Sequence, residues 1–409
     1  MQAKGAESQQ PFACKAGSYG GNLQTREQLA LIVQPATAMH ISINRGIATL
    51  LLAATAFFNG TAQGQDYQIE TVASGLDHPW SIAWLPNGTA LVTERAGRLR
   101  LLREGALVEE PVSGVPDVYA ASQGGLFEAL PDPDFADNNF IYLSFDQGTP
   151  EANATRVIRA RLDGMRLVDH ATLFTATPPK DTPVHYGGRM AFLADGTLLI
   201  GLGDGFDWRE RAQRLDNHFG KIVRINTDGS VPEDNPFVDT EDALPEIYSY
   251  GHRNVQGLLY DATTGKIWQH EHGPRGGDEI NLIRPGENYG WPVATHGIDY
   301  SGAIVSPFET RPGMVDPELV WTPSIAPSGM TLYRGDLFSQ WTGDLFVTAL
   351  AGRHLQRVEL VDGSPGDQHI MLEDRGERLR DVRTGPDGAL YVLVDADDGK
   401  VLRISPKQP

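Results

Sequence analysis

The feature that most constrains the fold is one pattern that occurs six times along the chain. Each copy opens with an Asp, Asn or Gly turn, runs through β-branched and aromatic residues, and closes on an alternating strand such as "KIVRIN". The copies lie at 85–102, 133–164, 193–229, 261–286, 341–363 and 385–406. Their spacing, without any long stretch of helical period, predicts an all-β, six-bladed β-propeller with long top-face loops, from about 66 to 405.

The strand pattern "YQIETVA" at 67–73 precedes the first copy. We expect it to complete the sheet of the last blade and so to close the ring. Two β-sandwiches are the alternative all-β architecture, but sandwiches do not predict the repeated unit.

The first 62 residues do not have the pattern of a folded domain. Met39 begins "MHISINR", which contains Arg45, and an apolar run of 13 residues follows at 46–58. This arrangement predicts a secretory signal at 39–62 with cleavage after Ala62, because the run is shorter than the roughly 20 residues of a membrane span. Residues 1–38 are then expected to be a disordered or non-native extension, and 63–409 the propeller domain.

The charge of the chain limits the partners that it can bind, and its cysteine content shows whether disulfide bonds can stabilise it. Of the 34 basic and 53 acidic side chains, four and two lie in residues 1–62, which leaves 30 basic against 51 acidic in the remainder. Such an acidic chain is a poor partner for nucleic acid or an anionic membrane surface. The single cysteine, Cys14, falls in the extension, so no disulfide framework is expected in the exported chain.

Two polar stretches have the residue types of a catalytic or binding site. His185 lies in "TPVHYGGRM", and Asp204 follows nineteen residues later in "LGDG". A carboxylate beside an imidazole orients it as a general base, although a lone histidine more often satisfies local backbone groups. Arg253 and Asn254, in "YGHRNVQG", offer a cationic fork and an amide, with a surface ion pair as the alternative.

The third stretch, "DRGERLRDVRTGPDG" at 374–388, contains several arginines. In an extended strand Arg378 and Arg380 point to one face and Leu379 to the other. Two guanidinium groups on one face of an acidic chain favour a ligand with several carboxylates. Pairing with the nearby acids Asp374, Glu377 and Asp381 is the alternative.

The fourth stretch, "HEHGPRGGDEINLI" at 270–283, is rich in glycine and polar side chains. His270 and His272 share a face of a strand, but no third zinc ligand stands at a typical spacing. Asp278, Glu279 and the carbonyls of "GENYGWP" better suit Ca²⁺, and an ordinary surface turn is the alternative. No nucleotide-binding glycine motif opens a helix, and the serines of 323–329 lack the setting of a nucleophile.

With these pieces in order, the chain resembles the soluble quinoprotein sugar dehydrogenases of the glucose/sorbosone dehydrogenase family. It is most similar to the bacterial aldose sugar dehydrogenases that use pyrroloquinoline quinone (PQQ). The resemblance covers about 67–405 and rests on long ordered motifs, among them "GLDHPWSIAWLPNG", "HYGGRM", "YGHRNVQG", "EHGPRGGDEINLIRPGENYGWP" and "RLRDVRTGPDGALYVL".

The resemblance implies a role for each matching position. His185 would take the proton of the anomeric hydroxyl while hydride passes from C1 of the sugar to the quinone, with Asp204 as its acidic partner. Arg253 would stabilise negative charge on the quinone oxygen. The matching cofactor-binding positions are Gln123, Arg253, Asn254, Tyr300, Ser324, Arg378 and Arg380.

The same resemblance implies two Ca²⁺ sites. The carbonyls of Gly273 and Pro274 would hold the ion that polarises the quinone, and Glu279 and Tyr289 match ligands of a separate structural ion. Two departures put cofactor affinity and sugar preference in doubt. Ala351 stands where the glucose dehydrogenase branch has a cofactor-pairing lysine, and Thr322 where it has a tryptophan.

The sequence therefore predicts an exported enzyme, periplasmic or secreted, that oxidises aldose sugars at C1 to lactones. Its cofactors would be PQQ and Ca²⁺, and an external acceptor such as a quinone, a cytochrome or a dye would take the electrons. A metal-dependent propeller hydrolase of the sugar lactonase type is one alternative. A noncatalytic carbohydrate-binding propeller is another.

Overall fold

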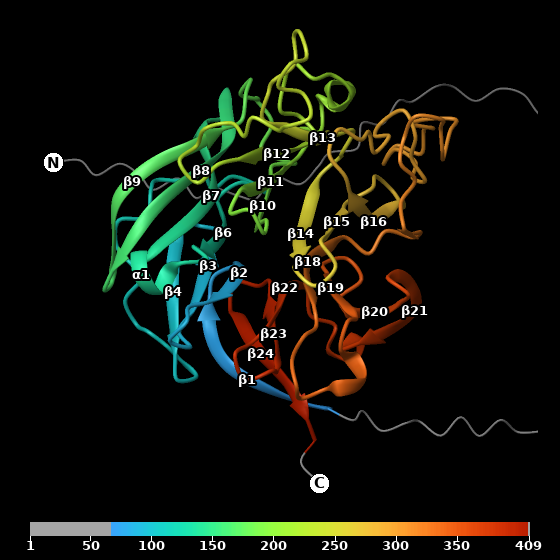
Figure 1. The fold of residues 1–409 in the computed structure, drawn as a ribbon. Coiled ribbons are helices and arrows are strands. Elements are labelled where there is room, and N and C mark those ends of the chain that lie inside the picture. Colours follow the sequence, from blue (N-terminus) through green and yellow to red (C-terminus); the bar gives the residue numbers. More distant parts are fainter. Residues whose placement is uncertain (1–66, 408–409) are drawn as a thin grey trace, which may run out of the picture. The chain divides into compact units, whose positions relative to one another are not determined.

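Residues 67–407 are described by a computed structural model and form a six-bladed β-propeller (Figure 1). Blade 1 consists of β2 (Pro79–Trp84), β3 (Ala90–Glu94), β4 (Arg98–Arg103) and β5 (Ala106–Leu107). Blade 2 consists of β6 (Leu126–Pro131), β7 (Phe140–Thr149), β8 (Ala152–Asp163) and β9 (Arg166–Thr175). Blade 3 consists of β10 (Gly187–Phe192), β11 (Leu198–Leu202), β12 (Lys221–Ile225) and β13 (Ile247–Tyr250). Blade 4 consists of β14 (Val255–Asp261), β15 (Lys266–Glu271), β16 (Asp278–Ile283) and β17 (Leu319–Trp321). Blade 5 consists of β18 (Pro327–Leu332), β19 (Leu345–Ala349), β20 (Leu355–Val361) and β21 (Ser364–Met371). Blade 6 consists of β22 (Leu379–Thr384), β23 (Leu390–Val394), β24 (Gly399–Pro406) and β1 (Tyr67–Leu76).

The helical elements of this part of the chain are short. They are α1 (Phe135–Asn138) and three 3₁₀ turns at Arg209–Gln213, Ser339–Trp341 and Glu373–Arg375. Between 67 and 407, none of them has the length and apolar character to cross a membrane.

The six sequence copies correspond to the six blades, which confirms the predicted architecture. Each copy begins in the turn between the first and second strands of a blade and covers the second and third strands. These strands are antiparallel neighbours in every blade. The innermost strand of each blade precedes its copy, so the repeat is shifted by one strand from the structural unit.

The ring is closed by β1, as the sequence predicted. β1 pairs antiparallel with β24, from Tyr67 opposite Pro406 to Leu76 opposite Gly399. The last blade thus takes its outermost strand from the beginning of the described chain. The signal and extension predicted for 1–62 lie outside the described residues and remain predictions.

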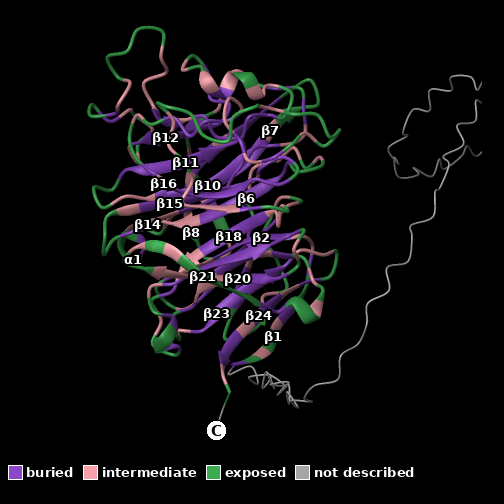
Figure 2. Ribbon diagram, turned by 90° about the vertical axis from the view of Figure 1, so that its right-hand side faces the viewer, coloured by how far each residue is buried: buried purple, intermediate pink, exposed green. Residues whose placement is uncertain are grey.

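Hydrophobic cores lie between the blades, where Figure 2 shows buried strands and exposed connecting loops. Six buried clusters each join two neighbouring blades around the ring. A smaller cluster of Trp80, Phe127 and Tyr186 lies at the hub. Each blade has apolar side chains on both faces of its sheet and buries them against the blades on either side. The burial of this apolar surface stabilises the packing of the blades around the ring.

Four charged side chains form a network at the propeller axis, three of them buried and Arg383 partly exposed. Arg189 of β10 lies 3.4 Å from Glu128 of β6 and 3.1 Å from Asp381 of β22. Arg383 of β22 pairs with the same two acids, at 2.8 and 3.1 Å. Because each charge has two partners of opposite sign, this network can be buried, and it links the innermost strands of three blades.

Candidate active site

Several residues singled out in the sequence stand shortly before an innermost strand. Gln123 precedes β6, His185 precedes β10, Asn254 precedes β14, Ser324 precedes β18 and Arg378 precedes β22. Innermost strands run in the same direction around a propeller, so the residues before them meet at one end of the central channel.

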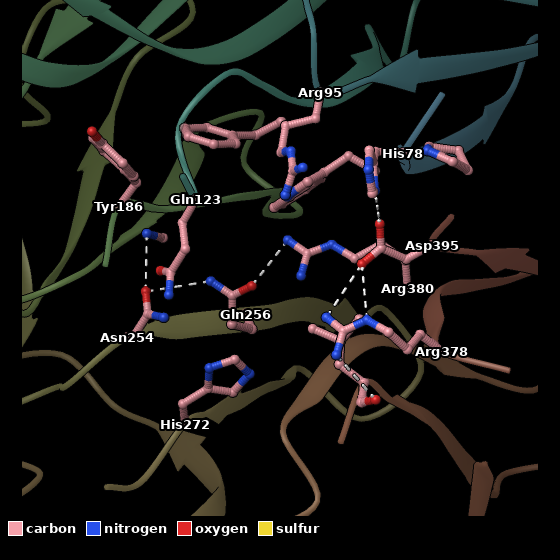
Figure 3. A pocket seen from close by; sticks show the side chains of 15 residues that line it. His78, Arg95, Gln123, Tyr186, Asn254, Gln256, His272, Arg378, Arg380 and Asp395 are labelled. Carbon is pink, nitrogen blue, oxygen red and sulfur yellow. Dashed lines mark hydrogen bonds and ion pairs between the residues drawn. The ribbon is translucent and has the colours of Figure 1, made fainter. Parts of the chain in front are cut away.

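Two cavities lie at this end of the hub. The first, which we call the cationic cavity, has a volume of about 620 Å³ and is lined by Arg95, Gln123, Asn254, Arg378 and Arg380, among others (Figure 3). The second, the vestibule, has a volume of about 840 Å³ and is lined by His185, Asp204, Arg253, Trp291 and Tyr300, among others. Segments 185–187, 253–254 and 272–274 contribute to both linings, so the two cavities are neighbours.

His185 and Asp204 form a buried dyad. The Nδ1 atom of His185 lies 2.7 Å from Oδ1 of Asp204, and the second carboxylate oxygen accepts a 2.7 Å hydrogen bond from Nε1 of Trp291. The backbone N–H of Phe206 also donates to Asp204. With the carboxylate held in this way, Nδ1 of His185 carries the hydrogen and Nε2 is left as the basic nitrogen.

The backbone of His185 has an unusual conformation that the surroundings maintain. Its φ is 54°, and its N–H donates to Oε1 of Gln123 at 2.9 Å. A Cβ on Gly203 would lie 2.2 Å from the carbonyl oxygen of His185, so this position requires glycine. Left-handed backbone outside glycine is concentrated at functional sites, where neighbouring groups compensate its energy.

Burial and charge act in opposite directions on this dyad. Burial lowers the pKa of His185, and the negative charge of Asp204 offsets that effect in part. Burial alone would raise the pKa of Asp204, but the charge and hydrogen bond of His185, with help from Arg253, bring this pKa below its ordinary value. The pair therefore holds a neutral imidazole next to an ionised carboxylate.

Arg253 connects the dyad with the glycine-rich stretch. Its guanidinium donates to the carbonyls of His272 at 3.0 Å and Gly273 at 2.6 Å, and its own carbonyl accepts from the N–H of Asp204. The Nε–H of Arg253 is buried and has no partner among the described residues.

Arg378 and Arg380 line the cationic cavity, while Leu379 between them packs into a core, as strand geometry predicted. Arg378 is 3.3 Å from Asp395, and Arg380 donates to Oε1 of Gln256 at 3.2 Å. Burial, together with neighbouring Arg189, lowers the pKa of Arg380 to about 9. A guanidinium buried in this way is stabilised by an anion beside it.

Two of the three acids that offered an alternative pairing for these arginines, Glu377 and Asp381, are engaged elsewhere. Glu377 pairs with Arg375 and Lys400, and Asp381 belongs to the axial network. The Nε–H of Arg380 also lacks a partner within 67–407. The cavity therefore suits an anionic ligand that carries more than one carboxylate.

The residues expected to hold metal ions are not all equally free to bind one. The carbonyl of Gly273 reaches the vestibule side but accepts from Arg253 there, so a cation at this oxygen would replace that hydrogen bond. Glu279 is buried directly opposite Glu271 in the β15–β16 ladder. Burial and the neighbouring Glu271 raise the pKa of Glu279 well above its usual value, which is the setting of a carboxylate pair that suits a cation.

Three of the predicted residues have different surroundings from the rest. Ser324 donates to Asp278 at 2.5 Å and is not part of either cavity lining. Tyr300 lines the vestibule and is 58% exposed, with its ring stacked on Phe206. The hydroxyl of Tyr289 donates to the carbonyl of Leu282.

Ala351 and Thr322, the two positions where the sequence differs from the glucose dehydrogenase branch, both lie in hydrogen-bonded segments near the site. Ala351 donates its N–H to the carbonyl of Ile325, and its neighbour Leu350 forms part of the cationic cavity wall. Thr322 accepts a hydrogen bond from the N–H of Gly277. Neither position supplies a cation or an aromatic ring.

Sequence reasoning missed several residues of the site. Trp80 and Arg95 line the cationic cavity, and Trp291 binds Asp204. Trp80 and Trp291 lie inside motifs that carried the family resemblance, which is the signal that could have found them. Arg95 lies in an ordinary-looking turn, "TERAGR", and only its place in the ring brings it to the site.

Known proteins with similar sequences point to the same kind of site as this geometry. The family model described as Glucose / Sorbosone dehydrogenase matches residues 76–403. The chain belongs to the glucose/sorbosone dehydrogenase family. The dehydrogenase is 43% identical over 345 residues to the aldose sugar dehydrogenase YliI of Escherichia coli, covering 83% of this chain and 93% of that protein. It is 46% identical to an uncharacterized protein, slr1608, of Synechocystis, covering 81% and 85%.

Solved structures show the same relationship. The soluble aldose sugar dehydrogenase of Escherichia coli in its apo form superposes on this dehydrogenase with a TM-score of 0.81 at 42% identity, over 83% of this chain and all of that one. A PQQ-bound aldose sugar dehydrogenase of Streptomyces coelicolor superposes with a TM-score of 0.69 at 29% identity, over 83% and 98%. The chain is thus a sugar dehydrogenase, as its sequence predicted.

Proposed function

We propose that this dehydrogenase oxidises aldose sugars at C1 to the lactone with PQQ as the hydride acceptor. The observation that carries this proposal is the His185–Asp204 dyad beside a cavity with incompletely paired arginines. A base and an anion-binding pocket side by side suit a reaction that removes a proton from a hydroxyl group and a hydride from the carbon that carries it.

His185 supplies the base. With its Nδ1–H directed to Asp204, Nε2 takes the proton of the anomeric hydroxyl, and Asp204 stabilises the imidazolium that forms. Trp291 holds the second oxygen of Asp204 and so fixes the orientation of the pair. When bound, the quinone accepts the hydride from C1 and the two electrons that it carries.

The polar residues around the dyad would hold the cofactor. Arg378 and Arg380 bind its carboxylates, and Gln123 and Asn254 provide amide groups at the boundary of the two cavities. The positive charge of Arg253 faces the vestibule, where it stabilises negative charge on the quinone oxygen. Tyr300 and Ser324 stay as weaker candidates, because Tyr300 is largely exposed and Ser324 is bound to Asp278.

Ca²⁺ completes the proposal at two places. Gly273 and Pro274 would present carbonyl oxygens to an ion that polarises the quinone. Glu279 and Tyr289 would belong to a structural site, which the buried Glu271–Glu279 pair supports. An exported location and an external electron acceptor belong to the same proposal.

A lactonase needs free acids around a metal in the channel. The acids at the axis, Glu128 and Asp381, are each neutralised by Arg189 and Arg383. This pairing favours the dehydrogenase over the hydrolase. A noncatalytic carbohydrate-binding propeller has no need of a buried, oriented His–Asp dyad.

The test is reconstitution of the purified protein with PQQ and Ca²⁺, followed by dye reduction with several aldoses. We expect His185→Ala to lower kcat by about 10²- to 10⁴-fold, the usual contribution of a general base. His170→Ala, an exposed histidine of β9, is the matched control and should behave as wild type. Full activity of His185→Ala would disprove the mechanism, and quinone-independent lactone hydrolysis would favour the lactonase.

A further inference from the structure

Arg95, in the turn between β3 and β4, has a backbone fixed on both sides. Its N–H donates to the carbonyl of His78 at 3.1 Å, and its carbonyl accepts from the N–H of Leu126 at 3.0 Å. Gly125 packs against it so closely that an added Cβ would lie 2.0 Å from the carbonyl oxygen of Arg95 and 2.8 Å from its Cγ. The chain therefore holds the stem of Arg95 in one place.

The guanidinium of Arg95 has no hydrogen-bond or ion-pair partner among residues 67–407, although it is partly buried. Two other arginines of the same blade do have a partner, since Arg98 and Arg100 both contact Glu94, at 2.6 and 3.5 Å. Figure 3 shows the Arg95 side chain directed into the cationic cavity. In a chain with such an excess of acids, an unpaired arginine at a cavity indicates that the missing partner is a ligand.

The charges around the cavity do not balance. Arg95 comes from blade 1, whereas Arg378 and Arg380 come from blade 6. In the lining formed by the described residues, the one carboxylate is Asp395, which already contacts Arg378 and His78. Three guanidinium groups therefore share one partly engaged acid, and an anion with carboxylates on more than one edge would relieve their repulsion.

We propose that Arg95 is a further cofactor-binding residue, which holds a carboxylate of the polycarboxylate quinone from the blade 1 side of the cavity. The inference rests on the proposed function, because it takes PQQ as the ligand. Arg378 and Arg380 hold the opposite part of the same anion. Arg95 thus supplies a cation from a different blade in a protein where Ala351 supplies none.

The experiment measures PQQ binding directly, by titration of the apoprotein followed by absorbance or calorimetry. Arg95→Gln should raise the Kd for PQQ roughly 10- to 100-fold, the worth of one charge-assisted hydrogen bond. Arg95→Lys should recover part of this loss, because it restores the charge without the planar fork. Arg103→Gln, an exposed arginine of β4 with no ion pair in the described chain, makes the same charge change and should leave Kd unchanged.

A second ligand separates a direct contact from a change in pocket shape. The trimethyl ester of PQQ lacks the carboxylate charges, so Arg95→Gln and wild type should bind it equally weakly. Equal affinity of both proteins for PQQ itself would overturn the role of Arg95 while leaving the proposed function intact. An equal loss for acid and ester would assign Arg95 to packing, which also overturns the inference. Failure of wild type to bind PQQ would refute the proposed function and this inference together.

Discussion

His185 is the residue whose chemistry depends most on its surroundings. Burial lowers its pKa, whereas Asp204 raises it, and the net pKa stays below the ordinary 6.5 of histidine. The neutral imidazole is the form that accepts a proton. A lowered pKa therefore keeps the base ready at a pH where an exposed histidine is already protonated.

This balance predicts the pH dependence of the enzyme. The acidic limb of kcat/KM against pH should have its midpoint below 6.5, because His185 must lose its proton before it can act. Asp204→Asn removes the charge that raises the pKa, so the limb should move to still lower pH. The same variant should lower kcat by about 10²- to 10⁴-fold, since the imidazolium loses its counter-charge.

Steady-state dye reduction in the PQQ-loaded enzyme measures both effects. Asp228→Asn, an exposed acid in the turn after β12, is the control and should keep the wild-type profile. A midpoint at or above 6.5 in wild type, or an unchanged kcat in Asp204→Asn, would contradict the assigned dyad.

At the level of elements, the β15–β16 ladder has an arrangement that a sheet does not normally tolerate. Glu271 and Glu279 are directly opposite each other and both are buried. Like charges opposite one another in a sheet are destabilising, and burial increases the repulsion. The Oδ1 atom of Asn281, two residues on, has no hydrogen-bond donor among the described residues.

A bound cation would remove this repulsion, which leads to a prediction about stability. Ca²⁺ should raise the thermal unfolding midpoint of wild type by several degrees relative to protein treated with a chelator. A ligand at 100 times its Kd contributes about 2.7 kcal/mol to folding. Glu279→Gln should lose the response to Ca²⁺, and in chelator it should be at least as stable as wild type because one buried charge is gone.

Differential scanning calorimetry with Ca²⁺ or chelator distinguishes these outcomes. Glu287→Gln, an exposed acid in the turn after β16, should respond to Ca²⁺ as wild type does. If Glu279→Gln kept the full Ca²⁺ response, the ion would have to bind elsewhere.

On the scale of the whole molecule, Arg189 of blade 3 contacts four other blades and so links five blades at the axis. It pairs with Glu128 and Asp381 and donates to the carbonyls of Gln256 and Ser328. Its guanidinium also lies 4.1 Å from the ring of Trp80, whose other neighbour is Arg380 at 4.5 Å. The axial network thus supports the floor of the cationic cavity.

Arg189→Met should therefore destabilise the entire ring. It would leave buried acids with fewer partners, and removal of one member of a buried ion pair typically reduces the free energy of unfolding by about 3–5 kcal/mol. Urea unfolding followed by circular dichroism measures the loss. Arg103→Met on the blade surface should change stability by less than about 0.5 kcal/mol, and a similarly small change for Arg189→Met would refute the role of the network.

The blade pattern could be predicted from sequence because it is local. A turn followed by two strands is encoded within one short stretch of chain, and six such units with a spare strand at 67–73 specify a closed ring. The same locality explains the one-strand shift between the repeat and the blade. The repeated turn signal lies between the first and second strands of each blade, so the pattern found in the sequence starts after the innermost strand.

Site residues could be predicted to lie together where they are close in the sequence. They could not where the chain brings them together from distant positions. Arg378 and Arg380 could be placed together because strand geometry puts alternate residues on one face. Asp395, the partner of Arg378, and the opposing Arg95 could not be foreseen, because each lies elsewhere in the chain from these two arginines.

The sequence by itself determined the number of blades, the closing strand and the family. Only the tertiary structure decided which polar groups meet at the hub, which arginines remain without an acid, and which way His185 faces. The physical reason is that strand patterning depends on near neighbours, whereas the charge and solvation of a side chain depend on groups that ring closure brings from far along the chain.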